Sequence, residues 1–465
     1  MRILLADLMS KHGYVVKDTV VGGYGSRMSP FSKTTRLYCH FKRNFHQVPS
    51  VQMATIAGIL AEAGHEVVAT SDKLVEADVA IVLSSLVDYK HETRWADEAR
   101  QKGVRVGFVG LAASKLSQLF LDHSDFVIQG EPEAAIMRLA VGETLGGLTP
   151  SPAIADLDSI PYARWDLIEK IPDVWQKIGL RDQLGGGSFS LMSSRSCPEF
   201  CTYCPHRILA SYRARSVKNI VDELEALCER HPNPYVVFRD PLFTFQRERC
   251  VHLADEIQFR KLKLHYECET RLDRLDEDLL KKLYASGLRR INFGVESVSP
   301  EILRKVARTP IAPEHAKAII ATCKRMGIGT VAFYVLGFLT DTWSSISATI
   351  EYSISLDSTY ALFKLLTPYP GTPLWKQMEP LVYEKDWEKF NGYTPTFKHP
   401  NLKPEELSFL LGAAFARFFM RPSFVANVWR LNNAFVQNFA RKLDVKAQEI
   451  HTRKELEVMS RQVEC

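Results

Sequence analysis

Short apolar runs alternate with segments of helical periodicity along residues 1–145. The run RILLAD at residues 2–7 predicts a buried strand, and residues 51–66 place apolar side chains at helical spacing. Four further strands are predicted by EVVAT, ADVAIVLSS, VRVGFVG and DFVIQGE. Nearly continuous apolar strands that alternate with helices are typical of a doubly wound parallel sheet. The pattern therefore predicts that residues 1–147 form one α/β domain.

The same rhythm returns after a Pro-rich connector. Residues 148–166 lack a clear period, and we expect residues 148–180 to be a linker. Six consecutive strand–helix pairs follow, which predict an incomplete (β/α)6 barrel over residues 181–378. The remainder, residues 379–465, is aromatic, basic and helical in pattern. Packing of these helices on the barrel is favoured, and contact of a basic amphipathic tail with anionic lipid is the alternative.

Parallel sheets bind ligands at the carboxyl ends of their strands. In the first domain the residues predicted at those ends are mostly small: Ser84, Ser85, Gly110, Ala112, Gly130 and Glu131. The connection between the first strand and the first helix is unusual, at roughly forty residues. It contains VVGGYGSRMSPFS at residues 20–32, which fits neither nucleotide-binding fingerprint. A loop that covers a ligand or a domain interface is favoured there over a phosphate cradle.

The composition is that of an ordinary soluble globular protein of two or three domains. The chain has 465 residues, 46% of them hydrophobic and 24% charged, with a net charge of +5. This net charge is too small to indicate a nucleic-acid-binding protein. No apolar run is long enough to span a bilayer. Nine cysteines, scattered apart from one group, do not form a disulfide framework. We expect a cytoplasmic protein.

The one group of cysteines lies just after the first predicted barrel strand. Cys197, Cys201 and Cys204 are spaced C-x3-C-x2-C. A structural zinc ion needs four ligands, and His206 is the only nearby candidate for the fourth. Three thiolates without an obvious fourth partner suit an iron–sulfur cluster. Chemistry alone favours the cluster over zinc and leaves both open.

The spacing, with Tyr203 before the last cysteine, resembles the radical S-adenosylmethionine (SAM) superfamily. Further segments resemble its branch with an N-terminal cobalamin-binding domain, which includes the anaerobic magnesium-protoporphyrin cyclase and several carbon methylases. These segments are residues 49–72, 125–133, 238–250, 267–297, 327–342 and 367–375. The resemblance implies a [4Fe–4S] cluster in which each of the three cysteines holds one iron and SAM chelates the fourth. Cleavage of SAM would then give a 5′-deoxyadenosyl radical that abstracts a hydrogen atom.

The resemblance also implies residues that contact the cofactors. Those for SAM are Tyr203, Asp240, Glu269, Arg271, Glu296 and Ser297, although an ion pair between Arg271 and Glu296 is the structural alternative. Those for cobalamin are Ser84, Ser85, Gly110, Gly130 and Glu131. The cobalt-binding motif D-x-H-x-x-G is absent, because Gly13 directly follows His12. The other candidate is His46 in the long connection, and we expect cobalt without a protein imidazole. The segment GFLTDT at 337–342 departs from the GLPGDT form common in the branch.

The function expected is radical SAM chemistry at an unactivated carbon, with methyl transfer from methylcobalamin favoured. The alternatives are a cobalamin-independent dehydratase, cyclase or lyase, and a non-catalytic cluster-based sensor. A small-molecule or lipid-like substrate and an external electron donor, such as flavodoxin or ferredoxin, are the expected partners. The other six cysteines are expected to be packing residues: Cys39, Cys228, Cys250, Cys268, Cys323 and Cys465.

Overall fold

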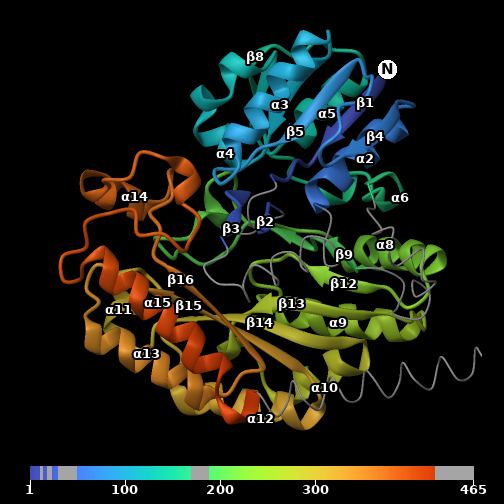
Figure 1. Cartoon of the computed structure of the whole chain (residues 1–465). Coiled ribbons are helices and arrows are strands. Elements are labelled where there is room, and N and C mark those ends of the chain that lie inside the picture. The colour runs from blue at the N-terminus through green and yellow to red at the C-terminus, as the bar shows by residue number, and fades with distance from the viewer. Residues whose placement is uncertain (11–13, 18–22, 30–49, 169–187, 425–465) are drawn as a thin grey trace, which may run out of the picture. The chain divides into compact units, whose positions relative to one another are not determined.

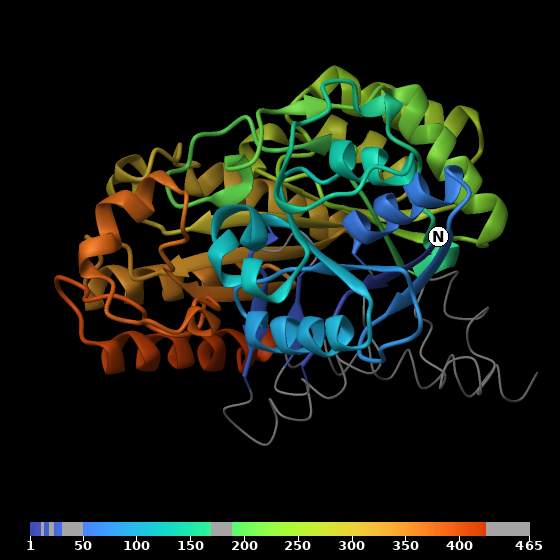
Figure 2. The same ribbon diagram turned by 90° about the horizontal axis from the view of Figure 1, so that it is seen from above.

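A computed structural model describes residues 1–10, 14–17, 23–29, 50–168 and 188–424 (Figure 1, and seen from above in Figure 2). The chain divides into two compact units, Met1–Leu411 and Gly412–Cys465. His12, His46, Cys39 and Cys465 lie outside the described residues, so the predictions that concern them stay predictions. Among the described helices, none combines the length and apolar content that a membrane crossing requires.

The first sheet has six parallel strands in the order β4-β1-β5-β6-β7-β8. The strands are β1 Arg2–Ala6, β4 Glu66–Thr70, β5 Val79–Leu83, β6 Arg105–Val109, β7 Phe126–Gly130 and β8 Gly147–Ser151. The helices between them are α2 Val51–Glu62, α3 Tyr89–Gln101, α4 Leu111–Lys115 and α5 Glu133–Ala140. The doubly wound sheet is confirmed. It also gains β8 from the first residues of the predicted linker, because these residues pair in parallel with β7.

The second sheet is also parallel and six-stranded, in the order β16-β15-β14-β13-β12-β9. Its strands are β9 Ser188–Leu191, β12 Tyr235–Phe238, β13 His265–Thr270, β14 Leu288–Glu296, β15 Gly329–Leu336 and β16 Tyr360–Leu365. The helices are α8 Val217–Arg230, α9 Arg247–Phe259, α10 Glu277–Ala285, α11 Pro300–Lys305, α12 Pro313–Met326 and α13 Trp343–Leu356. Since β9 and β16 are edge strands, the barrel is incomplete, as predicted.

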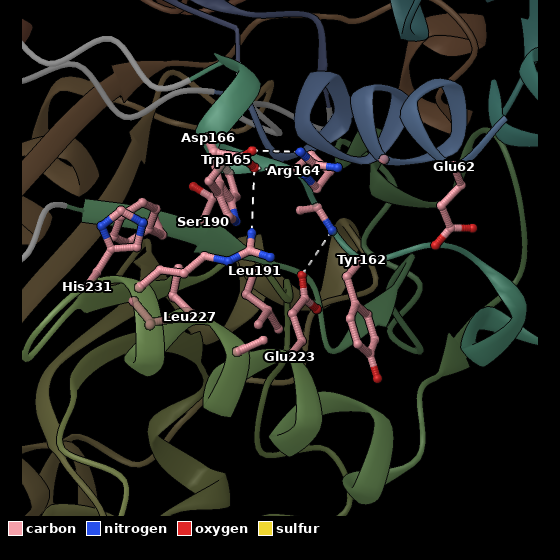
Figure 3. A pocket seen from close by; sticks show the side chains of 16 residues that line it. Glu62, Tyr162, Arg164, Trp165, Asp166, Ser190, Leu191, Glu223, Leu227 and His231 are labelled. Atoms are coloured by element: carbon pink, nitrogen blue, oxygen red, sulfur yellow. Dashed lines mark hydrogen bonds and ion pairs between the residues drawn. The ribbon is translucent and has the colours of Figure 1, made fainter. Parts of the chain in front are cut away.

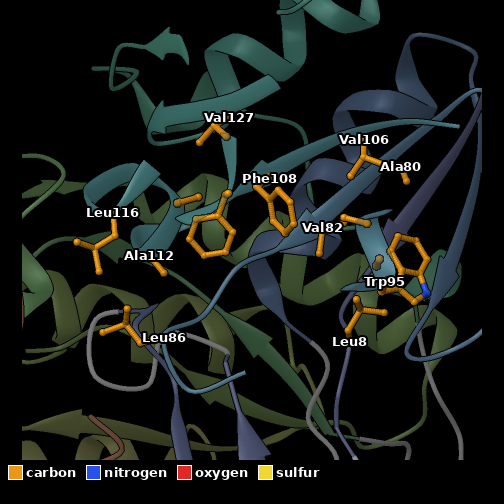
Figure 4. Packing of buried hydrophobic residues seen from close by; sticks show 14 of the residues in the cluster. Leu8, Ala80, Val82, Leu86, Trp95, Val106, Phe108, Ala112, Leu116 and Val127 are labelled. Atoms are coloured by element: carbon orange, nitrogen blue, oxygen red, sulfur yellow. The ribbon is translucent and has the colours of Figure 1, made fainter. Parts of the chain in front are cut away.

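The hydrophobic core of the first sheet continues beyond the strand ends (Figure 4). Val82, Phe108 and Val127 pack with Leu86 and Ala112, which follow the strands. The same cluster includes side chains from the segment after β16, Tyr369 and Phe390 among them. Burial of this apolar surface joins the first sheet to that segment within one compact unit.

The long insertion of the first domain forms part of this junction. Its described part contains two short antiparallel strands, β2 Tyr14–Val16 and β3 Ser26–Met28. Tyr24 is fully buried, its ring is stacked on that of Tyr369 with centroids 5.4 Å apart, and its hydroxyl donates to the carbonyl of Pro370. We call residues 14–17 and 23–28 the hairpin segment. It covers the strand ends of the first sheet, which agrees with a covering loop.

The helical region predicted over residues 379–465 is described only up to residue 424. After β16 the structure contains α14 Pro373–Met378, the 3-10 turns η7 Glu379–Leu381 and η8 Trp387–Lys389, and α15 Pro404–Phe419. Residues 382–403 are otherwise loop. Residues 425–465 lie outside the described residues, so the helices expected there stay a prediction.

Candidate functional site

The cysteine loop follows β9 at the carboxyl end of the barrel strands. The exit from β9 is held by the fully buried Asp240, whose carboxylate accepts hydrogen bonds from the Ser193 amide at 3.1 Å and the Ser193 hydroxyl at 2.7 Å. The Ser194 hydroxyl donates to the same carboxylate. The structure thus places Asp240, a predicted SAM residue, behind the loop, where it fixes the direction of the chain into the cysteines.

The loop itself is shaped by Arg207. One nitrogen of its guanidinium, Nη1, donates to the carbonyls of Cys197, Pro198 and Glu199 at 3.1–3.3 Å. The same guanidinium lies over the ring of Phe200, 3.7 Å from its centroid. Three carbonyls that turn toward one cation bend the backbone around it, and the thiol-bearing loop is therefore ordered by the protein itself.

The three thiols line one cavity of about 170 Å³. Its wall also contains Tyr203 and His206 from the loop, and side chains from the neighbouring strands and their ends: Glu269, Arg271, Asn292, Phe293, Glu296, Arg308 and Phe333. Of the predicted SAM residues, the structure therefore brings Tyr203, Glu269, Arg271 and Glu296 to the cysteines.

The thiols sit in an environment that suits an iron–sulfur cluster. Burial raises the pKa of Cys197 to about 11 and that of Cys204 to about 12, so the free thiols stay protonated and their ionisation depends on positive charge nearby. Arg308 donates from Nη1 to the Cys201 sulfur at 3.8 Å, which places a positive charge beside a developing thiolate. Within the described ranges no three His, Cys, Asp or Glu side chains converge on a single ion. A cluster does not need such convergence, because each thiolate binds a different iron.

Arg271 presents a donor that the protein leaves unused. Its Nη2 donates to Asp273 at 2.8 Å and to the carbonyl of Thr309 at 3.0 Å. Its Nη1 is buried and has no hydrogen-bond partner among the described residues. An unpaired buried guanidinium nitrogen costs free energy, and a carboxylate in the cavity would satisfy it. This geometry fits the carboxylate of SAM.

Glu296 lies at an irregularity in β14. Its φ of +64° is in the left-handed region, and the register with β15 shifts between Gly294 and Glu296. The carboxylate forms an ion pair with Arg308 at 3.4 Å and a hydrogen bond with Tyr203. Burial raises its pKa, against the effect of Arg308. The suggested ion pair between Arg271 and Glu296 is therefore wrong, because each residue has its own partner.

Ser297 turns the chain into α11. Its amide donates to the carbonyl of Val295 at 2.9 Å, and its hydroxyl accepts from the Ser299 amide at 3.2 Å. Both contacts lie within the turn, so the turn alone explains why a serine stands at this position. A contact between Ser297 and SAM stays a prediction.

A second, smaller cavity lies between the strand ends of the first sheet and the cysteine loop. It measures about 120 Å³ and is lined by Leu83, Leu111 and Glu131 from the first domain. The barrel side contributes Arg195 and His206, and His206 also lines the cavity of the thiols. Burial lowers the pKa of His206 to about 4, so the imidazole separating the two cavities is neutral at physiological pH.

The two predicted cobalamin serines are hydrogen-bonded within the first domain. Ser84 donates to the carbonyl of Val109 at 2.7 Å and accepts from the amide of Ala113 at 3.0 Å. Ser85 donates to Glu92 at 2.7 Å. Glu92 in turn forms a buried ion pair with Lys17 at 2.7 Å.

The two glycines are required by the backbone. Gly110 has φ +109° and Gly130 has φ +117°. A Cβ at Gly130 would lie 2.2 Å from the carbonyl oxygen of Ser151. The fold by itself thus accounts for these small residues, and their contact with cobalamin stays a prediction.

Glu131 joins the first sheet to the barrel. Its carboxylate pairs with Arg195 at 3.3 Å and also with Arg213. Glu133 pairs with the same Arg195 at 2.7 Å, and both carboxylates are largely buried. The segment GEPE at 130–133 therefore holds the two sheets together.

A third cavity, of about 180 Å³, opens between the connector, β9 and α8 (Figure 3). Most of its charged side chains have partners: Arg164 pairs with Asp166 at 2.7 Å, Arg230 reaches Asp166 at 3.6 Å, and Glu223 accepts from the Ala163 amide at 3.2 Å. The three thiols line the other cavity, and the candidate catalytic site is assigned there.

Two arginines of this site, Arg207 and Arg308, were not predicted from the sequence. Arg207 stands only three residues after Cys204. A cationic side chain so close to the motif could have been predicted to contact the cysteine loop. Arg308 lies beyond α11 and reaches Cys201 and Glu296 only through the tertiary fold. No local pattern marks it.

Comparison with known proteins agrees with this site. Residues 191–352 match the family model of the Radical SAM superfamily. An uncharacterized methyltransferase of Pyrococcus horikoshii is 28% identical over 64% of this chain and 68% of its own length. The anaerobic magnesium-protoporphyrin IX monomethyl ester cyclase of Cereibacter sphaeroides is 26% identical, and the match spans 62% of this chain but only 47% of the cyclase.

A solved structure shows the same fold. The cobalamin-dependent SAM radical enzyme OxsB, with aqua-cobalamin and SAM bound, has a TM-score of 0.63 and 12% identity. The likeness covers 88% of this chain and 66% of that one. The order of a doubly wound sheet followed by an incomplete barrel is therefore shared.

Proposed function

The chain belongs to the radical SAM superfamily, and on that premise we propose that it methylates an unactivated carbon of a small molecule. The observation that carries the proposal is the meeting of three thiols and the unused Nη1 of Arg271 at one cavity. A bound [4Fe–4S] cluster and SAM would supply the 5′-deoxyadenosyl radical there.

The residues of this chain would bind the cluster, orient SAM and enclose the radical. Cys197, Cys201 and Cys204 would hold three irons, and Arg207 keeps their loop in shape before the metal arrives. Arg271 would bind the carboxylate of SAM through Nη1. Closed barrel walls protect a reactive radical from water, and the buried Phe293 supplies part of that apolar wall.

Glu296 and Arg308 set the charge at the edge of the cavity. Arg308 is shared between the Cys201 sulfur, the Gly294 carbonyl at 2.6 Å and Glu296. These three contacts restrain the Arg308 guanidinium, so it would keep its position when the charge on the iron-bound thiolates changes. We propose that this pair keeps the electrostatic field constant at the cluster.

We propose cobalamin as the methyl carrier, since OxsB binds it on the same fold. The described residues leave a cavity of only about 120 Å³ at the strand ends. A corrin is far larger, and the hairpin segment with Tyr24 occupies the neighbouring space. Cobalamin binding to this chain would therefore require that segment to move.

This contact favours one second candidate. If Tyr24 stays packed on Tyr369, the chain would be a radical SAM dehydratase, cyclase or lyase without cobalamin. The electron for either reaction would come from an external donor such as flavodoxin or ferredoxin. Phe200, 70% exposed in the cysteine loop, lies where such a donor would approach the cluster.

Product analysis tests the proposal. The anaerobically reconstituted chain, with dithionite and SAM, should release methionine and 5′-deoxyadenosine. With a tetrapyrrole such as magnesium-protoporphyrin IX monomethyl ester among the substrates offered, methylation would add S-adenosylhomocysteine. A dehydratase or lyase would give 5′-deoxyadenosine with little or no S-adenosylhomocysteine, and a sensor would give neither product.

Binding of hydroxocobalamin tests the carrier. We expect base-off cobalamin with no nitrogen hyperfine splitting from the protein in electron paramagnetic resonance. The Tyr24→Ala variant should take up cobalamin faster than the unmodified chain, because the hairpin segment loses its anchor. No binding by either protein at micromolar concentration, with the cluster intact, would select the cobalamin-independent candidate.

A further inference from the structure

Lys364 lies on the inner face of the barrel, on its last strand. Phe333 lines the cavity of the thiols, and side chains two residues apart on a strand share a face. Val335 therefore faces the interior as well. Val335 is the register partner of Lys364, so the lysine points to the same side.

Two segments from outside the barrel strands cover the lysine. Its Nζ donates to the hydroxyl of Ser26 in the hairpin segment at 3.1 Å. The ring centroid of Tyr393, in the loop after η8, is 5.8 Å from Nζ. The backbone of Gly392 is so close that a Cβ there would lie 2.9 Å from Lys364 Cδ. Lys364 therefore lies at the open end of the barrel, beneath the hairpin segment and the loop after η8.

The ammonium of Lys364 is not neutralised by the described protein. Those residues place no carboxylate within ion-pairing distance of it, and Ser26 uses one of its three donors. Burial lowers the pKa of Lys364 to about 8, and the more distant Glu269 opposes that shift. Lys364 is half-buried, and an ammonium that is partly removed from water without a counterion is less favourable than one paired with an anionic ligand.

Glu269 connects this lysine to the catalytic cavity. The carboxylate that acts on Lys364 also lines the cavity of the thiols. The lysine is therefore near the cofactors, on the side of the barrel that the hairpin segment and the 391–393 loop enclose.

We propose that Lys364 binds an anionic oxygen group of the substrate, a carboxylate or a phosphate, and so orients the carbon to be modified toward the SAM site. The proposal rests on the proposed function for the identity of that site. It adds a substrate class: a molecule that carries an acidic group at a distance from its reactive carbon. Ser26 would not share the anion, because its hydroxyl donates to the carbonyl of Asn391 at 3.3 Å.

Ligand-observed saturation-transfer NMR tests this proposal with simple probes. The reconstituted full chain with SAM is offered benzoate, phenyl phosphate and, as the neutral control of similar shape, benzamide. Three proteins are compared: the unmodified chain, Lys364→Met and Lys364→Arg. Iron content and thermal unfolding report whether each variant is folded.

We expect benzoate or phenyl phosphate to give a signal that falls at least several-fold in Lys364→Met and is largely retained in Lys364→Arg. A signal from benzoate alone identifies a carboxylate, one from phenyl phosphate alone a phosphate, and both support an anion site. An unchanged signal in Lys364→Met, or an equal signal from benzamide, would overturn the proposal.

Acylation of lysines in the unmodified chain keeps the test decisive if Lys364→Met does not fold. Acetic anhydride labelling, followed by peptide mass spectrometry, should show protection of Lys364 by the anionic probe. Lys218, whose side chain is 80% exposed, is the internal control and should not be protected. Absence of protection at Lys364 would refute the assignment. Release of 5′-deoxyadenosine from the same sample shows separately whether the proposed function holds.

Discussion

The carboxyl ends of the two parallel sheets differ in what their polar groups contact. At the first sheet, Ser84 and Ser85 are hydrogen-bonded within the domain, and Glu131 is paired with arginines of the barrel region. At the barrel, the described residues leave one buried nitrogen of Arg271 without a partner and place no carboxylate within ion-pairing distance of Lys364.

This difference separates stability from binding. Polar groups that satisfy one another contribute to folding and leave nothing for a ligand, whereas buried donors without partners need one. The carboxyl end of a parallel sheet therefore indicates only where a ligand could bind. A buried hydrogen-bond donor without a protein partner indicates which of the two sheets is expected to bind one. The following predictions test this separation, in order of decreasing effect.

Removal of the three thiols should have the largest effect. In the variant with Cys197, Cys201 and Cys204 all changed to alanine, cluster absorbance, iron content and SAM cleavage should be lost completely. Cys323→Ala is the matched control, because Cys323 is buried in α12 and should leave iron content unchanged. Full iron content in the triple variant, or zinc in its place, would contradict the assignment of the site.

Arg271→Met should weaken SAM binding without loss of the cluster. A charge-assisted hydrogen bond contributes about 1.5–3 kcal/mol, so the Kd should rise about 10- to 100-fold. Anaerobic calorimetric titration with SAM measures it. Arg325→Met, on a side chain that is 61% exposed, serves as the control and should bind SAM normally. Equal affinity in the two variants would remove Arg271 from the binding site.

Gly294→Ala should disturb the same cavity through packing. The added Cβ would lie 2.1 Å from Glu296 Oε1 and 2.8 Å from Arg308 Nη2, so the ion pair must shift. Overpacking of this kind costs about 1–3 kcal/mol. We expect SAM affinity to fall by up to about tenfold. Gly146→Ala is the comparison, since nothing lies within 4 Å of a Cβ there. Matching affinities would show that Glu296 and Arg308 do not act on SAM.

Ser85→Ala should affect stability alone. The Glu92 carboxylate and the Asp88 amide each lose a buried hydrogen-bond partner, which costs about 1–3 kcal/mol in the free energy of unfolding. Urea denaturation followed by circular dichroism measures this loss. SAM affinity should be unchanged. A fall in cobalamin affinity larger than the loss of stability would show that this strand end contacts a ligand after all.

Much of the site was predictable because it is local in sequence. The spacing of Cys197, Cys201 and Cys204 places three thiols in one loop whatever the rest of the chain does. The alternation that predicts β13 and β14 also brings Glu269 and Arg271 to the strand ends, since parallel strands end at one edge. The partner of each charge was not predictable, and Glu296 pairs with Arg308 instead of Arg271.

The sequence by itself determined the two parallel sheets, the order of the domains and the position of the cysteines. Apolar periodicity and short-range spacing are properties of neighbouring residues, so they can be recognised in the chain before it folds. Only the tertiary structure decided that Tyr24 packs on Tyr369, and that Lys364 lies under the hairpin segment with no carboxylate of the described residues within ion-pairing distance. These contacts join residues distant in sequence, and their energies depend on burial, which exists only once the sheets have packed.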